Sequence, residues 1–194
     1  MKVLGVKAIV AVEGVSDQVA LEALAARHGT NLRAEGVRIV PIGGAHGISR
    51  FLTHFRTESA GLTIAGLCDA GEERVFRRAL EHSGFGSNLT RVEMERLGFY
   101  VCVADLEDEL IRALGPASVE AVLDSQGDLG SFRTFQKQPE WRGQRIEAQL
   151  RRFMGSANRR KIRYARLLVD ALDPACMPRP LVGVLAHSAA TPPT

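Results

Sequence analysis

The chain has 194 residues and a formal net charge of +3, and its 45% hydrophobic and 24% charged content is ordinary for a soluble globular protein. Its length predicts one domain, or one domain with an appendage. No apolar run approaches the roughly 18 residues of a membrane-spanning helix, and the first residues, MKVLGVKAIV, contain no secretory cleavage pattern. Cys68 and Cys102 lie in apolar runs and no CxxC pair is present. We therefore expect a cytoplasmic protein without membrane contact.

The first predicted unit begins with the apolar run Ala8–Val12, which is rich in β-branched residues and too short for a typical helix. Glu13 and Gly14 end this strand, and Ser16 is a good N-cap for an amphipathic helix that follows. A second carboxylate, Asp17, lies at the start of that helix. Both acids are thereby placed where open parallel sheets bind ligands.

Three further strand-like runs follow, at Val37–Ile42, Leu62–Cys68 and Phe99–Val103. The amphipathic segments Ile48–Phe55 and Glu72–Glu81 separate them and read as helices. Strands that alternate with helices predict an α/β fold with a mostly parallel central sheet flanked by helices.

From Glu107 onward the pattern is helical. We expect an α/β core over residues 1–110, a helical, basic extension packed on that core over residues 111–185, and a disordered tail over residues 186–194. Four helices are expected in and beside the extension, at Glu107–Leu114, Pro116–Gln126, Gln144–Phe153 and Arg159–Leu172.

Acidic residues follow three of the four expected strands. Glu13, Asp69 and Asp105 each come directly after an apolar run or within two residues of it. Because the carboxyl ends of parallel strands share one edge, these side chains should converge, although a single aspartate after a strand is more often a cap or loop residue. Oxygen ligands favour Mg²⁺ or Mn²⁺ over zinc, and two such ions suit displacement at a phosphodiester. Further acids close enough along the chain are Asp17, Glu72 and Glu107.

The charge of the chain is unevenly divided. Residues 1–110 contain 12 basic against 15 acidic residues, whereas residues 111–194 contain 13 against 7. Most of the positive excess lies in residues 131–166, which predicts a surface for a polyanion beside the acidic site. The alternative is a solvated arginine-rich helical face. Seven arginines are candidates for phosphate contact: Arg142, Arg145, Arg151, Arg152, Arg159, Arg160 and Arg163.

Aromatic residues are interleaved with these arginines. Such side chains could stack on unpaired bases, or they could pack the helices onto the sheet under the arginine stems. Packing is favoured for Phe132, Phe135, Phe153 and Tyr164, whereas the two roles are about equally weighted for Trp141.

Several short motifs resemble a known family. EGVSD after the first strand, IGG after the second, LCD after the third, and the later DLEDEL and SANRRKIRYARLLVDAL are similar to the Toprim domain of OLD-family (overcoming lysogenisation defect) nucleases. The resemblance covers about Lys7 to Leu172 and implies a Rossmann-like Toprim fold, with two Mg²⁺ or Mn²⁺ ions and cleavage of DNA by water. It implies catalytic roles for Glu13 and for Lys161, which would support charge in the transition state. The implied metal ligands are Glu13, Asp17, Asp69, Asp105 and Glu107.

The chain departs from the family pattern at two points. Where the usual motif is Asp-x-Asp, it has Asp69, Ala70 and Gly71, so either one metal site is weakened or Glu72 substitutes for the second carboxylate. It also contains no GxxxxGK[ST] motif, so an ATPase would have to be a separate partner protein. Two alternatives to a nuclease remain: a catalytically degenerate Toprim module that binds nucleic acid or a partner ATPase, and a phosphohydrolase or nucleotidyl transferase acting on small molecules. The sequence does not indicate the oligomeric state.

Overall fold

A four-stranded, all-parallel sheet forms the centre of the protein. The structure is a computed structural model that describes residues 5–58 and 61–190. The strand order is β2-β1-β3-β4, and each neighbouring pair is parallel. The sheet confirms the expected α/β class. Its strands are β1 (Ala8–Val12), β2 (Val37–Pro41), β3 (Thr63–Cys68) and β4 (Phe99–Val101).

Strand β1 is buried on both faces, which explains its continuous apolar sequence. All five of its residues are buried. Ala8, Val10 and Val12 belong to one hydrophobic cluster, whereas Ile9 and Ala11 belong to another. Because successive side chains of a strand point to opposite faces, β1 contributes to two separate cores.

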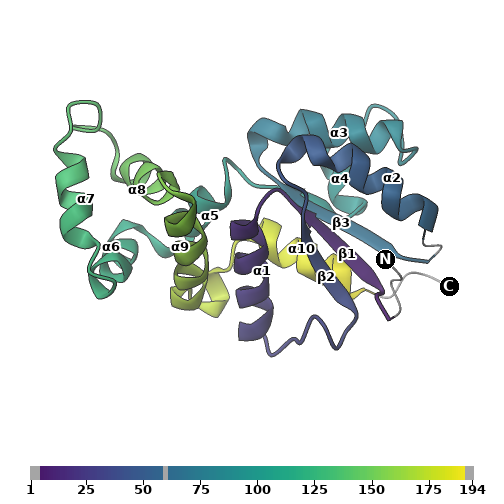
Figure 1. The fold of residues 1–194 in the computed structure, drawn as a ribbon, viewed down its shortest axis with the longest axis horizontal. Helices are drawn as coiled ribbons and strands as arrows, with labels where there is room; N and C mark the ends of the chain where they lie inside the picture. The colour runs from purple at the N-terminus through teal and green to yellow at the C-terminus, as the bar shows by residue number, and fades with distance from the viewer. Residues whose placement is uncertain (1–4, 59–60, 191–194) are drawn as a thin grey trace.

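Different helices cover the two faces of the sheet (Figure 1). One face is covered by α1 (Val15–Arg27) and α10 (Arg179–Ala189). The other face is covered by α2 (Ile48–Glu58), α3 (Glu73–His82) and α4 (Arg91–Arg96). The chain thus has the three-layer arrangement typical of doubly wound α/β proteins.

The C-terminal helix α10 corrects the expected disordered tail. Residues 186–189 belong to this helix, whereas residues 191–194 lie outside the described part of the chain. Leu181 and Val184 are fully buried in the cluster beneath β1 and β3. Gly183 permits this close approach, since a Cβ there would lie 2.3 Å from the ring of Tyr100. Helix α10 therefore buries apolar side chains of the sheet that would otherwise be exposed to solvent.

The remaining helices form a helical arm, which we define as α5–α9, beside the carboxyl ends of the strands (Figure 1). The arm joins the core where α9 lies along α1. The expected helices are present with shifts of up to three residues at their ends, whereas α4, α7 and α10 correspond to no expected helix. The arm consists of α5 (Leu106–Leu114), α6 (Pro116–Ser125), α7 (Leu129–Gln136), α8 (Ile146–Gly155) and α9 (Asn158–Ala171).

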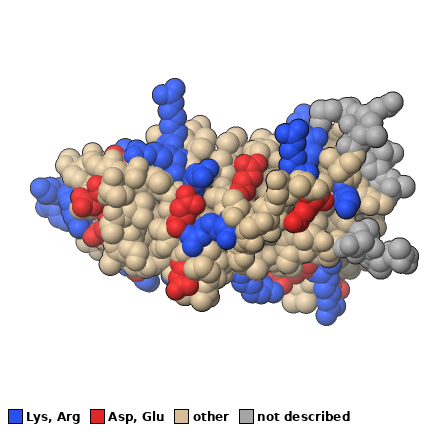
Figure 2. All heavy atoms as spheres, turned by 90° about the horizontal axis from the view of Figure 1, so that it is seen from below, with Lys and Arg blue, Asp and Glu red and all other residues tan. Residues whose placement is uncertain are grey.

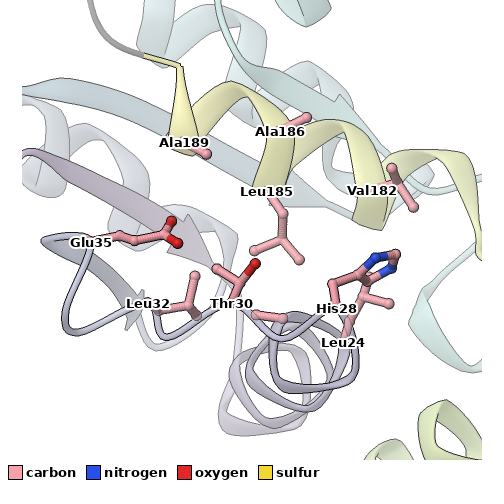
Figure 3. Close-up of a pocket in the computed structure, with 10 residues that line it drawn as sticks. Leu24, His28, Thr30, Leu32, Glu35, Val182, Leu185, Ala186 and Ala189 are labelled. Atoms are coloured by element: carbon pink, nitrogen blue, oxygen red, sulfur yellow. The ribbon is translucent and has the colours of Figure 1, made fainter.

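Two further features complete the fold. In the described part of the chain, three short 3₁₀ helices lie at Ala45–Gly47, Ala70–Glu72 and Pro174–Cys176. A cavity of about 210 Å³ remains between α1 and α10, and apolar side chains such as Leu24 and Leu185 dominate its walls (Figure 3). Within residues 5–58 and 61–190, no helix is long and apolar enough to span a membrane.

Truncation of a buried α10 side chain should measure how much this helix stabilises the sheet. We expect Leu181→Ala to lower the free energy of unfolding by about 2–5 kcal/mol, because a buried leucine leaves a cavity when truncated. The adjacent Val182 is 39% exposed, so Val182→Ala should change the free energy of unfolding by no more than about 0.5 kcal/mol. Urea denaturation provides the measurement. Equal effects of the two substitutions would show that α10 is not a structural cover.

Candidate metal and nucleic-acid site

The strand order places two acidic residues at a topological switch point. Helix α1 leaves β1 on one face and leads to β2, whereas α2 crosses the other face and leads to β3. The crevice between β1 and β3 is the position where open α/β sheets bind ligands. Glu13 follows β1 and Asp69 follows β3, and a Glu13 Oε1 atom accepts a hydrogen bond of 2.9 Å from the Asp69 backbone N–H. The sheet itself therefore brings together two acids separated by 56 positions.

Asp17 adds a third carboxylate at the start of α1. Its Oδ2 atom accepts a 2.8 Å hydrogen bond from the backbone N–H of Gly14, so this side chain also caps the helix. Asp17 is only 8% exposed. Burial raises the pKa of its carboxyl, although the Gly14 hydrogen bond and the charge of Lys161 oppose the shift. A capping role and a position at the acidic edge are thus combined in one residue.

Burial and mutual repulsion raise the pKa values of the acids at this edge. The pKa of Asp69 is raised to about 8, first by burial and then by the charges of Glu13, Asp17 and Asp105. Burial likewise raises the pKa of Glu13, with Asp17 and Glu72 adding to the effect. With a pKa of about 8, the Asp69 carboxyl is largely protonated at neutral pH. Because the neighbouring carboxylates repel one another, a cation bound at this edge would stabilise their ionised forms.

The loop after β4 and the start of α5 contribute two more acids. Asp105 caps α5 through a 2.9 Å hydrogen bond from the Asp108 N–H to its Oδ1 atom, and its Oδ2 atom accepts a 2.6 Å hydrogen bond from Arg151 Nε. Glu107 Oε2 lies 3.3 Å from Lys161 Nζ, while its Oε1 atom is buried and has no hydrogen-bond partner among the described residues. An unpaired buried acceptor costs about 1–3 kcal/mol. A cation ligated by that oxygen would remove this cost.

Lys161 faces the acids across a cleft because α9 packs along α1. The cleft has a volume of about 320 Å³, and its lining includes Glu13, Asp17, Asp69 and Lys161. Burial alone would lower the pKa of Lys161, but the charges of Glu107, Asp17 and Asp69 outweigh it and raise the pKa. The ammonium group is thus charged at neutral pH and is held beside the acidic edge.

The acids offer the oxygen ligands that a hard cation prefers, but their side chains are too far apart to bind one ion together. Oxygen donors and a buried, unpartnered carboxylate oxygen fit Mg²⁺ or Mn²⁺. Among the described residues, no three or more Asp, Glu, His or Cys side chains are grouped closely enough to hold an ion. Arg151 and Lys161 currently pair with Asp105 and Glu107. Ligation by all the expected acids therefore requires side-chain rearrangement and release of Asp105 from Arg151.

The two glutamates after Asp69 have different environments. Glu73 forms ion pairs of 2.5 Å with both Arg77 and Arg91. Glu72 makes no side-chain hydrogen bond or ion pair in the described part of the chain, and its charge contributes to the raised pKa of Glu13. Glu72, rather than Glu73, is therefore the carboxylate available near the missing position of the Asp-x-Asp motif.

The arginines of the expected nucleic-acid surface divide into two groups, and Figure 2 shows basic side chains interspersed with acidic ones along the arm at its left. Arg151, Arg160 and Arg163 are engaged: Arg151 with Asp105, Arg160 over the Phe153 ring at 4.2 Å, and Arg163 with Gln126 and Asp128. The other four are exposed and at most weakly paired. They are Arg142, Arg145, Arg152 and Arg159.

The aromatic residues of the arm mostly pack its interior. Phe132, Phe153 and Tyr164 are at most 4% exposed, which confirms their expected packing role. Phe135 stacks on Trp141 with ring centroids 5.2 Å apart. Trp141, for which both roles were open, is thus part of the aromatic cluster of the arm.

One polar residue of the cleft, Asn158, was not among the predicted site residues. Asn158 lies three positions before Lys161 at the start of α9 and lines the same cleft. Residues three apart share a helix face, so this spacing was available as a signal once Lys161 was singled out.

Comparisons with known proteins agree with the α/β fold of the chain. Residues 6–70 match the family model of the overcoming lysogenization defect protein-like TOPRIM domain. The chain is similar in fold to the C-terminal region of the Xanthomonas campestris pv. campestris OLD protein, with a TM-score of 0.73 and 19% identity over 96% of this chain and 94% of that one. It is also similar in fold to the C-terminal region of the Burkholderia pseudomallei OLD protein, with a TM-score of 0.70 and 16% identity over 95% of this chain and 97% of that one. A comparison with curated proteins gives no match.

The raised pKa of Asp69 predicts a distinctive pH dependence of stability. In the folded protein this carboxyl keeps its proton up to about pH 8, whereas its ordinary value is 3.8. Between these values the folded state binds more protons than the unfolded state, so the free energy of unfolding should fall as pH rises from about 4 to about 8. Urea denaturation in the presence of a chelator should show that the free energy of unfolding falls less over this pH range in Asp69→Asn than in the wild type. The exposed Asp124 provides the control Asp124→Asn, and parallel curves for all three proteins would contradict the assignment.

Proposed function

We propose that this protein, which carries an OLD-like Toprim domain, is a metal-dependent phosphodiester hydrolase that nicks or cleaves DNA. The observation that carries the proposal is the cleft where the acids after β1 and β3 face Lys161 from α9. Toprim domains generally use divalent metals, and Mg²⁺ or Mn²⁺, as one or two ions, fits the oxygen donors of this chain. In this proposal the acidic edge would bind the metal ions and the basic arm beside it would bind the DNA.

Each acid has a defined part in this proposal. Glu13, Asp17 and Asp69 would hold cations at the switch point, and Asp105 and Glu107 would do so from the start of α5. The bound ions would lower the pKa of water and stabilise the attacking and leaving oxygens of the phosphodiester. Asp69 must lose its proton to act as a ligand, so cation binding and deprotonation are coupled.

Lys161 would act on the phosphate rather than on the metal. Neighbouring carboxylates raise the pKa of its ammonium group, so the group retains its proton and cannot serve as a general base near neutral pH. A fixed positive charge beside the reacting phosphate stabilises the extra negative charge of the transition state. Lys161 also pairs with Glu107 at 3.3 Å, which holds the ammonium at the cleft.

The arm favours a polymeric substrate over a small phosphate ester. Arg142, Arg145, Arg152 and Arg159 are exposed on the segment that leads to the cleft, where they could contact several phosphates of one strand or duplex. A small-molecule phosphohydrolase would use the same acids without these arginines.

A supercoiled-plasmid assay with Mg²⁺ or Mn²⁺ tests the function. We expect Glu13→Gln to reduce nicking on the order of 10²–10³-fold, the effect typical of losing one preorganised group that stabilises a transition state. Glu22→Gln is the matched control, because Glu22 is exposed on α1 and bonds only to Gln18 within the described chain. Its nicking rate should equal that of the wild type. Equal nicking by wild type and Glu13→Gln would indicate a contaminating nuclease and contradict the proposal.

A second function is supported by a specific observation. Ala70 and Gly71 carry no carboxylate, and the acids of the described residues are not grouped as a metal site. A Toprim module that binds nucleic acid or a partner ATPase without cleavage would have these properties. Gly71 provides a direct comparison, since its φ is not positive and a Cβ there would meet nothing within 4 Å.

Restoring the Asp-x-Asp motif should separate the two functions. We expect Gly71→Asp to strengthen Mn²⁺ binding about tenfold, measured as the increase in melting temperature on addition of Mn²⁺, because a ligand of the native state raises its stability. Gly130→Asp places the same charge on exposed α7, again in open space, and is the control. A Mn²⁺ response in wild type supports the nuclease. A response that appears only in Gly71→Asp supports the non-cleaving module.

A further inference from the structure

A second group of arginines lies outside the site described above. Three come from α3 and one from α4, and they surround a hollow of about 590 Å³ on the sheet face opposite α1 and α10. We call this hollow the α3/α4 arginine pocket. Glu81 and the segment 88–90 complete its lining. The four arginines are Arg74, Arg77, Arg78 and Arg91.

The charges in this pocket are not balanced. Glu73 pairs with both Arg77 and Arg91, and Glu81 Oε1 is occupied by a 2.9 Å hydrogen bond from the Leu89 N–H. Arg74 and Arg78 are exposed, and neither makes a side-chain hydrogen bond or ion pair within residues 5–58 and 61–190. Two guanidinium groups therefore remain free for an anion.

One more donor in the pocket lacks a partner. The Nε atom of Arg77 is buried and has no acceptor among the described residues, although the same side chain donates from Nη2 to Glu73. Buried donors are almost always paired in folded proteins. Arg77 therefore brings an unsatisfied donor to the side chains that line the pocket.

The position of the pocket relates it to the acidic edge. Helix α3 begins four residues after Asp69, so Arg74 lies in its first turn, close to the carboxyl end of β3. The helical arm and α3 lie on different sides of that edge (Figure 1). A nucleic acid that crosses the edge from the arm would continue toward α3.

We propose that the α3/α4 arginine pocket binds backbone phosphates of the same DNA that the acidic edge acts on, so that the molecule holds its substrate on both sides of the cleft. This inference rests on the proposed function. Guanidinium groups match phosphate oxygens through paired N–H donors, which suits a phosphodiester backbone. DNA is favoured over an acidic protein because the free guanidinium groups of Arg74 and Arg78 add to the positive charge of the exposed arm arginines on the other side of the acidic edge.

Charge reversal of the two free arginines tests the pocket. We expect Arg74→Glu/Arg78→Glu to weaken binding of a 30-base-pair duplex at least tenfold, measured by fluorescence anisotropy in chelator so that no cleavage occurs. The slope of log affinity against log salt should also fall by about two, since each phosphate contact contributes about 0.9. Arg74→Ala/Arg78→Ala, which introduces no repulsion, should lower that slope equally.

The matched control reverses two arginines at the other end of the sheet. Arg33 precedes β2 and Arg38 lies within it, and both are exposed. Arg33→Glu/Arg38→Glu changes the net charge equally and should weaken binding less than twofold. Equal weakening by the two charge-reversed variants, or wild-type affinity in both pocket variants, overturns the inference and leaves an acidic protein as the occupant. In that case plasmid nicking by wild type still upholds the proposed function, whereas wild type that neither binds nor nicks DNA overturns both.

Discussion

Buried carboxylates that share one edge of a parallel sheet impose the main constraint on this structure. Burial and mutual repulsion raise the pKa of Glu13, Asp17 and Asp69 together, so the edge stores unfavourable electrostatic energy. Backbone groups partly offset it, because the N–H groups of Gly14 and Asp69 donate to two of these acids. The sheet fixes where the acids lie, and neutralising charge has to come from elsewhere.

The helical arm supplies positive charge to the acids from a distant part of the chain. Arg151 from α8 pairs with Asp105, and Lys161 from α9 pairs with Glu107. The arm is held in place by apolar packing: α9 lies along α1, and aromatic residues such as Phe132 and Phe153 fill its interior. Hydrophobic packing thus positions the cations, and the cations stabilise the acidic edge. A divalent ion that enters would compete with Arg151 for Asp105.

The closure of the sheet by α10 has consequences for the site. Strands β1 and β3 carry apolar residues on both faces, so the core is stable only when both faces are covered. Helix α1 covers part of one face, and Leu181 and Val184 of α10 cover the rest. Because α1 also carries Asp17 and contacts α9, the C-terminal helix indirectly supports the geometry between Asp17 and Lys161.

The sequence alone determined the local features: the apolar run of β1, the strand-end position of Glu13 and Asp69, and the helix that carries Lys161. These depend on periodicity and on short motifs, which neighbouring residues encode. Three other features result from tertiary packing: α10 covers the sheet, Arg151 pairs with Asp105, and Arg74 and Arg78 share a pocket with Arg91. Each of these depends on contacts between distant segments. Composition and spacing do not encode such contacts, because packing of the whole chain determines which charged side chains meet.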